Sequence, residues 1–275
     1  MIGARRPYGA SLAVAVLVLV AGAPSPSRSQ TAPAPVQTPY EPRVGQPGKD
    51  VVWVPTPQVL VDKMLDLAKL TPKDYLMDLG SGDGRTVITA AKRGSRAHGI
   101  EYNPDMVELA RKNAAEAKVS DRATFEKADL FETDFSKAQV ITMFLLPSIN
   151  MKLRPTLLDL APGTRIVSNS FTMEDWTADE TATITEDCTS WCTALLWIVP
   201  AKVAGTWQMP QGELQLTQQF QMLSGSLGGA GISDARVRGT EVTFTAGGTR
   251  FAGTVSGNTM KGTAPGGASW TATRK

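Results

Sequence analysis

The sequence predicts an α/β domain with a mostly parallel sheet, followed by a small antiparallel β-domain. Between residues 49 and 201, short apolar runs alternate with stretches of helical periodicity, which is typical of strands joined by helices. A glycine-rich turn, Gly80–Gly84, follows the first apolar run. Residues 202–275 hold 14 of the 25 glycines. Their turn signals recur about every eight to ten residues, which indicates short antiparallel strands.

The α/β domain is expected to begin with a helix at 59–70, after Pro57, which Thr71-Pro72 ends. The strands that follow are expected at 75–78, 97–101, 123–128, 139–145 and 165–170, and the helices between them at 86–92, 104–117 and 151–160. Strands joined by helices pair in parallel, so helices should cover both faces of this sheet.

Two further strands, at 182–187 and 193–199, are expected to end this domain as an antiparallel pair. Cys188 and Cys192 then lie opposite each other across a three-residue hairpin loop, within reach of a disulfide. An exported protein would oxidise this pair. If the segment is helical instead, the two cysteines are free thiols.

The C-terminal domain, residues 202–275, is expected to form a small antiparallel sheet or barrel without a visible catalytic cluster. Its strands are expected at 205–209, 213–222, 225–227, 234–238, 241–245, 250–256, 259–263 and 270–273. Trp207 and Trp270 are expected to fill its small core.

The N-terminal residues 1–23 have the features of a signal peptide. Arg5 and Arg6 precede an apolar run at 11–20, and small residues follow it. The run is shorter than the roughly 20 residues of a membrane span, although an uncleaved anchor is the alternative. Residues 24–48 hold seven of the 18 prolines and are expected to form a disordered or extended tether. The sequence therefore predicts a periplasmic or secreted protein, or one anchored to the inner membrane.

Charge and composition exclude several classes of function. The net charge of +2 argues against a protein that coats nucleic acid, and no nucleic-acid partner is expected. One histidine and two cysteines exclude most zinc sites, and no metal is expected. This net charge is unevenly distributed along the chain: residues 49–201 carry a net charge of about −5, and residues 202–275 carry about +4.

The most informative motif is Asp78-Leu79-Gly80-Ser81-Gly82-Asp83-Gly84-Arg85. Its glycines let the backbone approach a ligand at the carboxyl end of the first strand, and Glu101, about 20 residues later, can accept ribose hydroxyls. A dinucleotide fingerprint would place its third glycine where Arg85 stands, and no P-loop lysine follows. Asp78 suits a ligand with an ammonium group, so S-adenosylmethionine fits better than NAD.

With these motifs the chain resembles the class I S-adenosylmethionine-dependent methyltransferases, whose sheet is Rossmann-like. More narrowly, it resembles the bacterial relatives of the mitochondrial protein-lysine methyltransferases, over residues 50–180. The motifs that carry this resemblance are Val54-Pro55-Thr56-Pro57, Asp78–Arg85, Glu101-Tyr102-Asn103-Pro104, Ala128-Asp129-Leu130-Phe131, Phe144-Leu145-Leu146-Pro147 and Lys152-Leu153-Arg154-Pro155.

The resemblance implies which residues bind the cofactor. In this set, residues 80–82 pass along the methionine moiety, Glu101 holds the ribose, Tyr102 flanks the adenine, Asp129 accepts the adenine amino group and Thr56 closes over the cofactor. Asp129 also fits a helix N-cap. The full implied set is Thr56, Asp78, Gly80, Ser81, Gly82, Glu101, Tyr102, Asp129 and Leu130.

The methyl acceptor is expected at the end of the fourth strand, where class I enzymes usually present it. This chain has Leu145, Leu146 and Pro147 there, so backbone carbonyls and apolar walls are the expected acceptor site. No side chain is assigned a catalytic role. The alternative is a plain buried strand end that a proline terminates.

The sequence leaves two functional hypotheses. The first is a methyltransferase that acts on a protein lysine or another amine, with a small-molecule acceptor as a variant. The second is an exported, non-catalytic binding or scaffold protein, because S-adenosylmethionine is made in the cytosol. The membrane is a partner only if the signal segment is uncleaved.

Overall fold

A computed structural model describes residues 9–15 and 40–275 of the chain. The chain divides into two units, Met1–Pro39 and Tyr40–Lys275. Most of the predicted signal peptide and residues 24–39 of the predicted tether lie outside the described residues. Among the residues that are described, no helix is both long and apolar enough to span a membrane.

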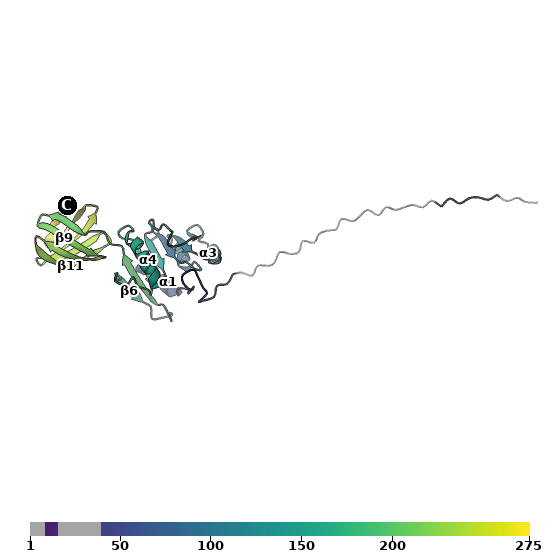
Figure 1. Cartoon of the computed structure of the whole chain (residues 1–275), viewed down its shortest axis with the longest axis horizontal. Coiled ribbons are helices and arrows are strands. Elements are labelled where there is room, and N and C mark those ends of the chain that lie inside the picture. Colours follow the sequence, from purple (N-terminus) through teal and green to yellow (C-terminus); the bar gives the residue numbers. More distant parts are fainter. Residues whose placement is uncertain (1–8, 16–39) are drawn as a thin grey trace, which may run out of the picture. The chain divides into compact units, whose positions relative to one another are not determined.

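Within residues 40–201, seven strands form one sheet, and the predicted α/β fold is confirmed (Figure 1). In spatial order these strands are β3 (Ala123–Lys127), β2 (Arg96–Glu101), β1 (Tyr75–Leu79), β4 (Val140–Met143), β5 (Arg165–Asn169), β7 (Thr193–Ile198) and β6 (Glu180–Thr183). The first five pair in parallel, whereas β7 and β6 add an antiparallel edge. The strand order reverses between β1 and β4, and open α/β sheets bind ligands at such a point.

Helices cover both faces of this sheet, and each face has its own core. The helices are α1 (Gln58–Leu67), α2 (Arg85–Lys92), α3 (Pro104–Glu116) and α4 (Pro147–Leu158). Successive residues of a strand point to opposite faces of the sheet. Val140 therefore belongs to the core on the side of α1, α2 and α3, and Ile141 belongs to the core on the side of α4. Since both faces are covered, the central strands are buried and mostly apolar, with Asp78 and Thr142 as polar exceptions.

Several predicted elements have other bounds in the structure. In the C-terminal domain, the strand predicted at 234–238 begins at Ala230, and the strand predicted at 213–222 ends at Gln219. Helix α4 begins at Pro147, four residues before its predicted start, because proline is well suited to a first helical position. Strand β6 spans Glu180–Thr183 rather than 182–187. The predicted three-residue hairpin loop is therefore wrong, and a longer loop, residues 184–192, joins β6 to β7. Asp187 and Trp191 adopt positive φ values there, which removes both from a strand.

Residues 40–48 differ from the disordered or extended tether that the sequence predicts. A hydrogen-bonded turn places Gln46 beside Trp53, with the Trp53 N–H donating to the Gln46 carbonyl at 2.9 Å. The Gln46 amide also donates to the Tyr40 hydroxyl at 2.6 Å. Residues 40–53, called here the strap, thus form a folded segment next to the sheet. The proline-rich composition indicates that this segment has no core of its own, but it does not show that the α/β domain can hold the segment in place.

The C-terminal domain forms a closed antiparallel barrel (Figure 1). Its strands are β8 (Gly205–Met209), β9 (Gly212–Gln219), β10 (Met222–Leu227), β11 (Ala230–Arg238), β12 (Glu241–Ala246), β13 (Thr249–Ser256), β14 (Thr259–Thr263) and β15 (Ser269–Arg274). Pairing of β15 with β8 closes the barrel. Trp207, Phe244 and Trp270 are buried inside it, as expected of a barrel whose interior is filled by side chains.

Candidate active site

A cleft of about 530 Å³ lies at the carboxyl ends of β1, β2 and β4, where the strand order reverses. Residues that follow these strands form its floor, and residues 46–56 form a wall from the N-terminal side. All nine residues of the predicted cofactor set line the cleft, as do Leu145 and Leu146. Pro147 is not among the lining residues, because it begins α4 and is exposed.

The glycine turn brings the backbone into the cleft at positions that exclude larger residues. Gly82 has a φ of +54°, and a Cβ atom there would lie 2.6 Å from Nε1 of Trp53. Gly80 has a φ of +77°, and its Cβ atom would lie 3.1 Å from Leu145. These contacts explain why the loop requires glycine, in space as well as in backbone conformation.

Ser81 contributes its backbone rather than its hydroxyl to the cleft. Its Oγ is buried and has no hydrogen-bond partner among the described residues. A Cβ atom at Gly99, on the neighbouring strand β2, would lie 2.5 Å from this oxygen. The serine side chain therefore packs against β2, which accounts for the glycine at position 99.

Glu101 ends β2 with its carboxylate fixed by two backbone amides. The Gly82 N–H donates to Oε2 and the Asn103 N–H donates to Oε1, both at 2.9 Å. Each oxygen keeps a further lone pair for a hydroxyl donor. This geometry suits a ribose with two adjacent hydroxyl groups, which is the role predicted for Glu101.

Asp78 is a buried carboxyl at the end of β1. Burial raises the pKa of Asp78 to about 7, and the nearby carboxylates of Asp83 and Glu101 act in the same direction. The Thr142 hydroxyl donates to its Oδ1 at 2.6 Å and opposes this shift. A cationic group bound close to Asp78 would favour the charged carboxylate.

The strap reaches the predicted adenine end of the cleft through Lys49. Its ammonium group forms an ion pair with Asp129 and lies 4.8 Å from the ring centroid of Tyr102. The hydrogen bond from Lys49, with a second from the Phe131 N–H, lowers the pKa of Asp129. Asp129 is thus an ionised acceptor at the cleft, and Lys49 is a contact that sequence reasoning missed.

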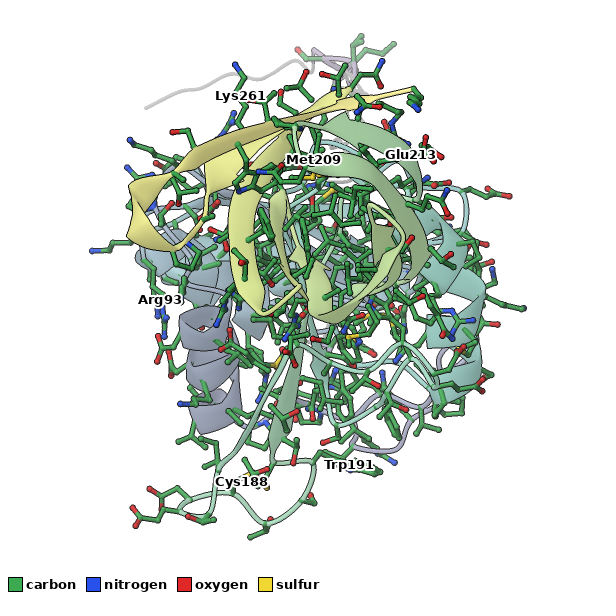
Figure 2. The ribbon with its side chains drawn as sticks, turned by 90° about the vertical axis from the view of Figure 1, so that its left-hand side faces the viewer. Arg93, Cys188, Trp191, Met209, Glu213 and Lys261 are labelled. Carbon is green, nitrogen blue, oxygen red and sulfur yellow. A yellow bond between two sulfur atoms is a disulfide. The ribbon has the colours of Figure 1, made fainter. Side chains whose placement is uncertain are left out.

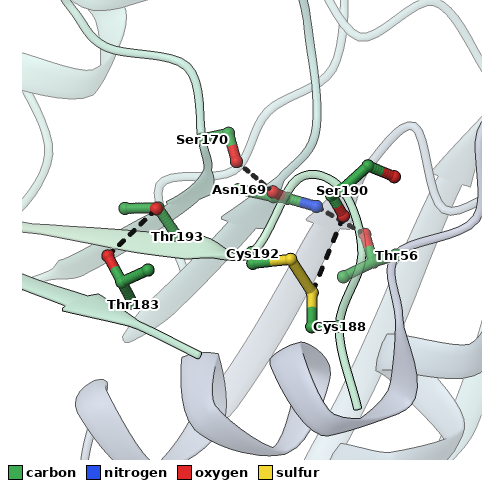
Figure 3. Close-up of a disulfide and its surroundings, with 8 residues drawn as sticks. All are labelled: Thr56, Asn169, Ser170, Thr183, Cys188, Ser190, Cys192 and Thr193. Carbon is green, nitrogen blue, oxygen red and sulfur yellow. Dashed lines mark hydrogen bonds between the residues drawn. A yellow bond between two sulfur atoms is a disulfide. The ribbon is translucent and has the colours of Figure 1, made fainter. Parts of the chain in front are cut away.

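Thr56 is buried between the glycine turn and the end of β5. The Asn169 amide donates to its hydroxyl at 3.3 Å, and Arg85 donates to its carbonyl at 2.9 Å. Arg85 also pairs with Asp83, so the turn, α2 and residue 56 are joined. Figure 3 shows the Asn169 amide directed at Thr56, and the disulfide between Cys188 and Cys192 on the loop that joins β6 to β7.

The acceptor end of the cleft is aromatic as well as aliphatic. Phe144, Phe171 and Trp191 line it, and we call them the aromatic trio. Their ring centroids lie 5.0 to 5.8 Å apart. Sequence reasoning did not find Phe171 and Trp191, because they follow different strands. The signal in the sequence that could have indicated Trp191 is its position between two nearby cysteines, Cys188 and Cys192.

The chemistry of the residues that line the cleft fits S-adenosylmethionine. The glycine turn offers a cradle that a Cβ atom would fill, Glu101 presents a fixed carboxylate, and Tyr102 and Asp129 present an aromatic face and an acceptor. Beside the cradle, the acceptor end of the cleft is apolar and aromatic, and Arg85, which follows the glycine turn, is paired with Asp83. The fold and the site therefore define a methyltransferase that uses S-adenosylmethionine.

Comparisons with known proteins agree with this class. A family model described as the ANTKMT methyltransferase domain matches residues 78–180. A protein-lysine N-methyltransferase from Saccharolobus islandicus (strain REY15A) is 44% identical over 133 residues, which are 47% of this chain and 83% of that protein. The chain belongs to this family of methyltransferases.

Another relative matches over a smaller share of its own length. The adenine nucleotide translocase lysine N-methyltransferase from Mus musculus is 36% identical over 118 residues, which are 42% of this chain and 51% of that protein. The chain thus spans about half the length of this mouse protein.

A solved structure has the same core fold. An RNA methyltransferase from Salinibacter ruber, determined with S-adenosyl-L-homocysteine, is 49% identical, with a TM-score of 0.51. The match covers 55% of this chain and 96% of that structure. The relatives therefore share the cofactor domain, whereas their names differ in the acceptor.

Proposed function

We propose that this methyltransferase transfers the methyl group to the side-chain amine of a protein lysine. The observation that carries the proposal is the acceptor end of the cleft, which is apolar and aromatic where it adjoins the glycine turn. A lysine side chain is a long aliphatic stem with a terminal amine, and such a channel suits both parts. The protein-lysine N-methyltransferase name of the relative from Saccharolobus islandicus supports the same acceptor.

Charge favours a basic protein over RNA as the acceptor. Residues 49–201, which contain the cleft, carry a net charge of about −5. A polyanion would meet repulsion there, because RNA binding depends on lysine and arginine residues that neutralise phosphates. A lysine-bearing segment would instead be attracted to this domain.

The chain's own residues have two tasks in the reaction. When bound, S-adenosylmethionine supplies a methyl group that its sulfonium already activates. Glu101, Asp129 and the glycine turn hold and orient the ligand, and in-line alignment then provides most of the acceleration. At the acceptor end, apolar walls exclude water and favour the neutral form of a lysine amine.

Methyl transfer with a labelled cofactor tests the acceptor. The full chain is incubated with methyl-labelled S-adenosylmethionine, a protein mixture or total RNA, and the labelled products are hydrolysed to amino acids or nucleosides. We expect the label in Nε-methylated lysine, and prior acetylation of the protein amines should abolish it. Label only in nucleosides would contradict the lysine acceptor, and binding of S-adenosylmethionine without any transfer would favour a non-catalytic binding protein.

We also propose that the chain is exported to an oxidising compartment. The proposal is supported by the signal-like residues 1–23 and by the Cys188–Cys192 disulfide, which persists in such compartments. Mass spectrometry of the protein from cell fractions gives its N-terminus and its location. A cytosolic protein that retains Met1 and two free thiols would overturn this proposal.

A further inference from the structure

The loop between β6 and β7 holds one aromatic side chain at the cleft. Trp191 lines the cleft although 43% of its surface is exposed, and its φ is +56°, a conformation that bulky residues rarely adopt. Cys188 and Cys192 form a disulfide around it, with Cα atoms 5.8 Å apart. Figure 2 shows Cys188 and Trp191 on this loop, which projects from the sheet domain. An exposed tryptophan held in an unfavourable backbone conformation points to a function.

The other two members of the aromatic trio come from separate strands. Phe144 directly follows β4, and Phe171 lies two residues after β5. Ring centroids are 5.8 Å apart between Phe144 and Phe171, 5.0 Å between Phe171 and Trp191, and 5.8 Å between Phe144 and Trp191. Their interplanar angles differ, from 23° to 59°, so the three rings do not form one flat stack.

The trio and the cofactor groups occupy different parts of the same sheet edge. The glycine turn follows β1, Glu101 ends β2, and Asp129 follows β3. Phe144 follows β4, and Phe171 follows β5. Because β1 and β4 are neighbours, the trio lies beside the glycine turn and beyond it from the ribose end. A group bound by the trio would thus reach the cleft from the side opposite the nucleoside.

We infer that Phe144, Phe171 and Trp191 form an aromatic cage for the methylated amine of the acceptor. The inference rests on the proposed function and specifies its substrate site. Aromatic faces attract cations, and quaternary or methylated ammonium groups are especially suited to such cages. Leu145 and Leu146, which adjoin the trio, are apolar, so at this end of the cleft the aromatic faces can attract a positive charge.

The chemistry of methyl transfer requires such stabilisation on the acceptor side. The lone pair of the neutral amine nitrogen forms the new nitrogen–carbon bond while the carbon–sulfur bond breaks, and that bond's electron pair remains on sulfur. Positive charge therefore moves from sulfur to nitrogen, and the methylated ammonium then loses a proton to water. Faces that bind the developing cation better than the neutral amine favour the transition state.

The disulfide acts as a positioning element for the cage. It closes a short loop around Trp191, which reduces the number of conformations available to the tryptophan. Without the bond, the loop would regain freedom, and the third face of the cage would be present for only part of the time. Cys188 and Cys192 themselves contact neither the amine nor the cofactor in this scheme.

A binding experiment tests the cage without any methyl transfer. The full chain, saturated with S-adenosylhomocysteine, is titrated with trimethyl-lysine amide and with its uncharged carbon isostere. We expect the wild type to bind the cation about tenfold more tightly than the isostere, and Trp191→Ala to reduce this ratio to about twofold or less. Trp191→Phe should retain an intermediate ratio, and Cys188→Ser combined with Cys192→Ser should lower it about threefold.

The controls separate failure of the cage from failure of the enzyme. Met222→Ala removes an exposed apolar side chain of the barrel that does not line the cleft, and it should leave the ratio unchanged. The Trp191 variants should bind S-adenosylhomocysteine with an affinity within about twofold of the wild type. If the wild type does not bind S-adenosylhomocysteine at all, the proposed methyltransferase function itself is contradicted. An unchanged ratio in Trp191→Ala, no cation preference in the wild type, or tighter binding of a nucleoside than of the cation would overturn the cage.

Discussion

Asp78 lies in an environment very different from that of a surface carboxylate. It lies on the central strand β1, is buried, and has an elevated pKa of about 7. A carboxyl in an unfolded chain has a pKa of about 3.9, so the folded state binds this proton more tightly. Asp78 therefore stabilises the folded protein below about pH 4, and this contribution is lost as the pH rises towards 7.

Replacement of Asp78 by asparagine tests this pH dependence. Relative to Asp78→Asn, the wild type should lose free energy of unfolding between pH 4 and 7, as measured by denaturant titration without ligand. Affinity for S-adenosylmethionine should show the opposite trend and rise through pH 7 in the wild type, because the cationic ligand favours the carboxylate. Asp121→Asn, at an exposed carboxylate, is the matched control. A parallel pH profile for Asp78→Asn and the wild type would contradict the assignment.

For single residues of the cleft, the sequence predicts those that belong to local motifs. Glu101 was predicted because an acid at the end of the second strand has a fixed place relative to the glycine turn. Lys49, Asn169 and Trp191 were not predicted to line or shape the cleft, since each reaches it from a segment distant in sequence. Their contacts depend on tertiary packing, which spacing along the chain does not encode.

The glycine turn and the strap act together as structural elements. The turn approaches Trp53 so closely at Gly82 that a Cβ atom would lie 2.6 Å from the indole nitrogen. The strap also supplies Lys49, which pairs with Asp129. Disturbance of the turn should therefore displace the strap as well as the backbone that cradles the ligand.

Gly82→Ala and Gly247→Ala form a matched pair that separates these effects. Both glycines have a φ of +54°, but a Cβ atom at Gly247 meets nothing within 4 Å. Each change should cost about 1 kcal/mol of backbone strain in denaturant titrations, and Gly82→Ala should cost more because its Cβ atom also displaces Trp53. Only Gly82→Ala should raise the dissociation constant for S-adenosylhomocysteine, by about tenfold or more. Equal affinities in the two variants would exclude a role for the close approach.

Most elements could be predicted, since apolar periodicity and glycine signals are local. The exceptions have physical reasons. Pro147, predicted to belong to the acceptor site, instead begins α4, because the fixed φ of proline suits the first position of a helix. The loop after β6 is longer than predicted, because residues with positive φ interrupt a sequence that otherwise suits a strand.

At the scale of the whole molecule, the barrel and the sheet domain share polar contacts. Arg236 of β11 donates to Asp179 at 2.6 Å, and the Asp179 side chain has no exposed surface. Gln221 donates to the Thr177 carbonyl at 2.7 Å, and Arg238 pairs with Glu180. The acidic sheet domain and the basic barrel are thus joined through groups of opposite charge, which composition suggested only as an uneven distribution of charge.

Loss of Arg236 should destabilise this junction. Among the described residues, Arg236→Ala leaves the buried Asp179 side chain with the Ile198 N–H as its remaining donor. We therefore expect about 1 to 3 kcal/mol less stability in thermal or denaturant unfolding. Arg250→Ala removes an exposed arginine from β13 and should change stability by less than about 0.5 kcal/mol. Equal stability of the two variants would mean that the ion pair adds nothing to the junction.

The cleft at the carboxyl ends of β1, β2 and β4 is expected to bind S-adenosylmethionine through Glu101. Calorimetric titration of the full chain with S-adenosylmethionine tests it most directly. We expect one site per chain, an affinity at least tenfold weaker in Glu101→Gln, and unchanged binding in Glu108→Gln, an exposed glutamate on α3. No heat of binding in the wild type, or equal affinity in Glu101→Gln and the wild type, would contradict the claim.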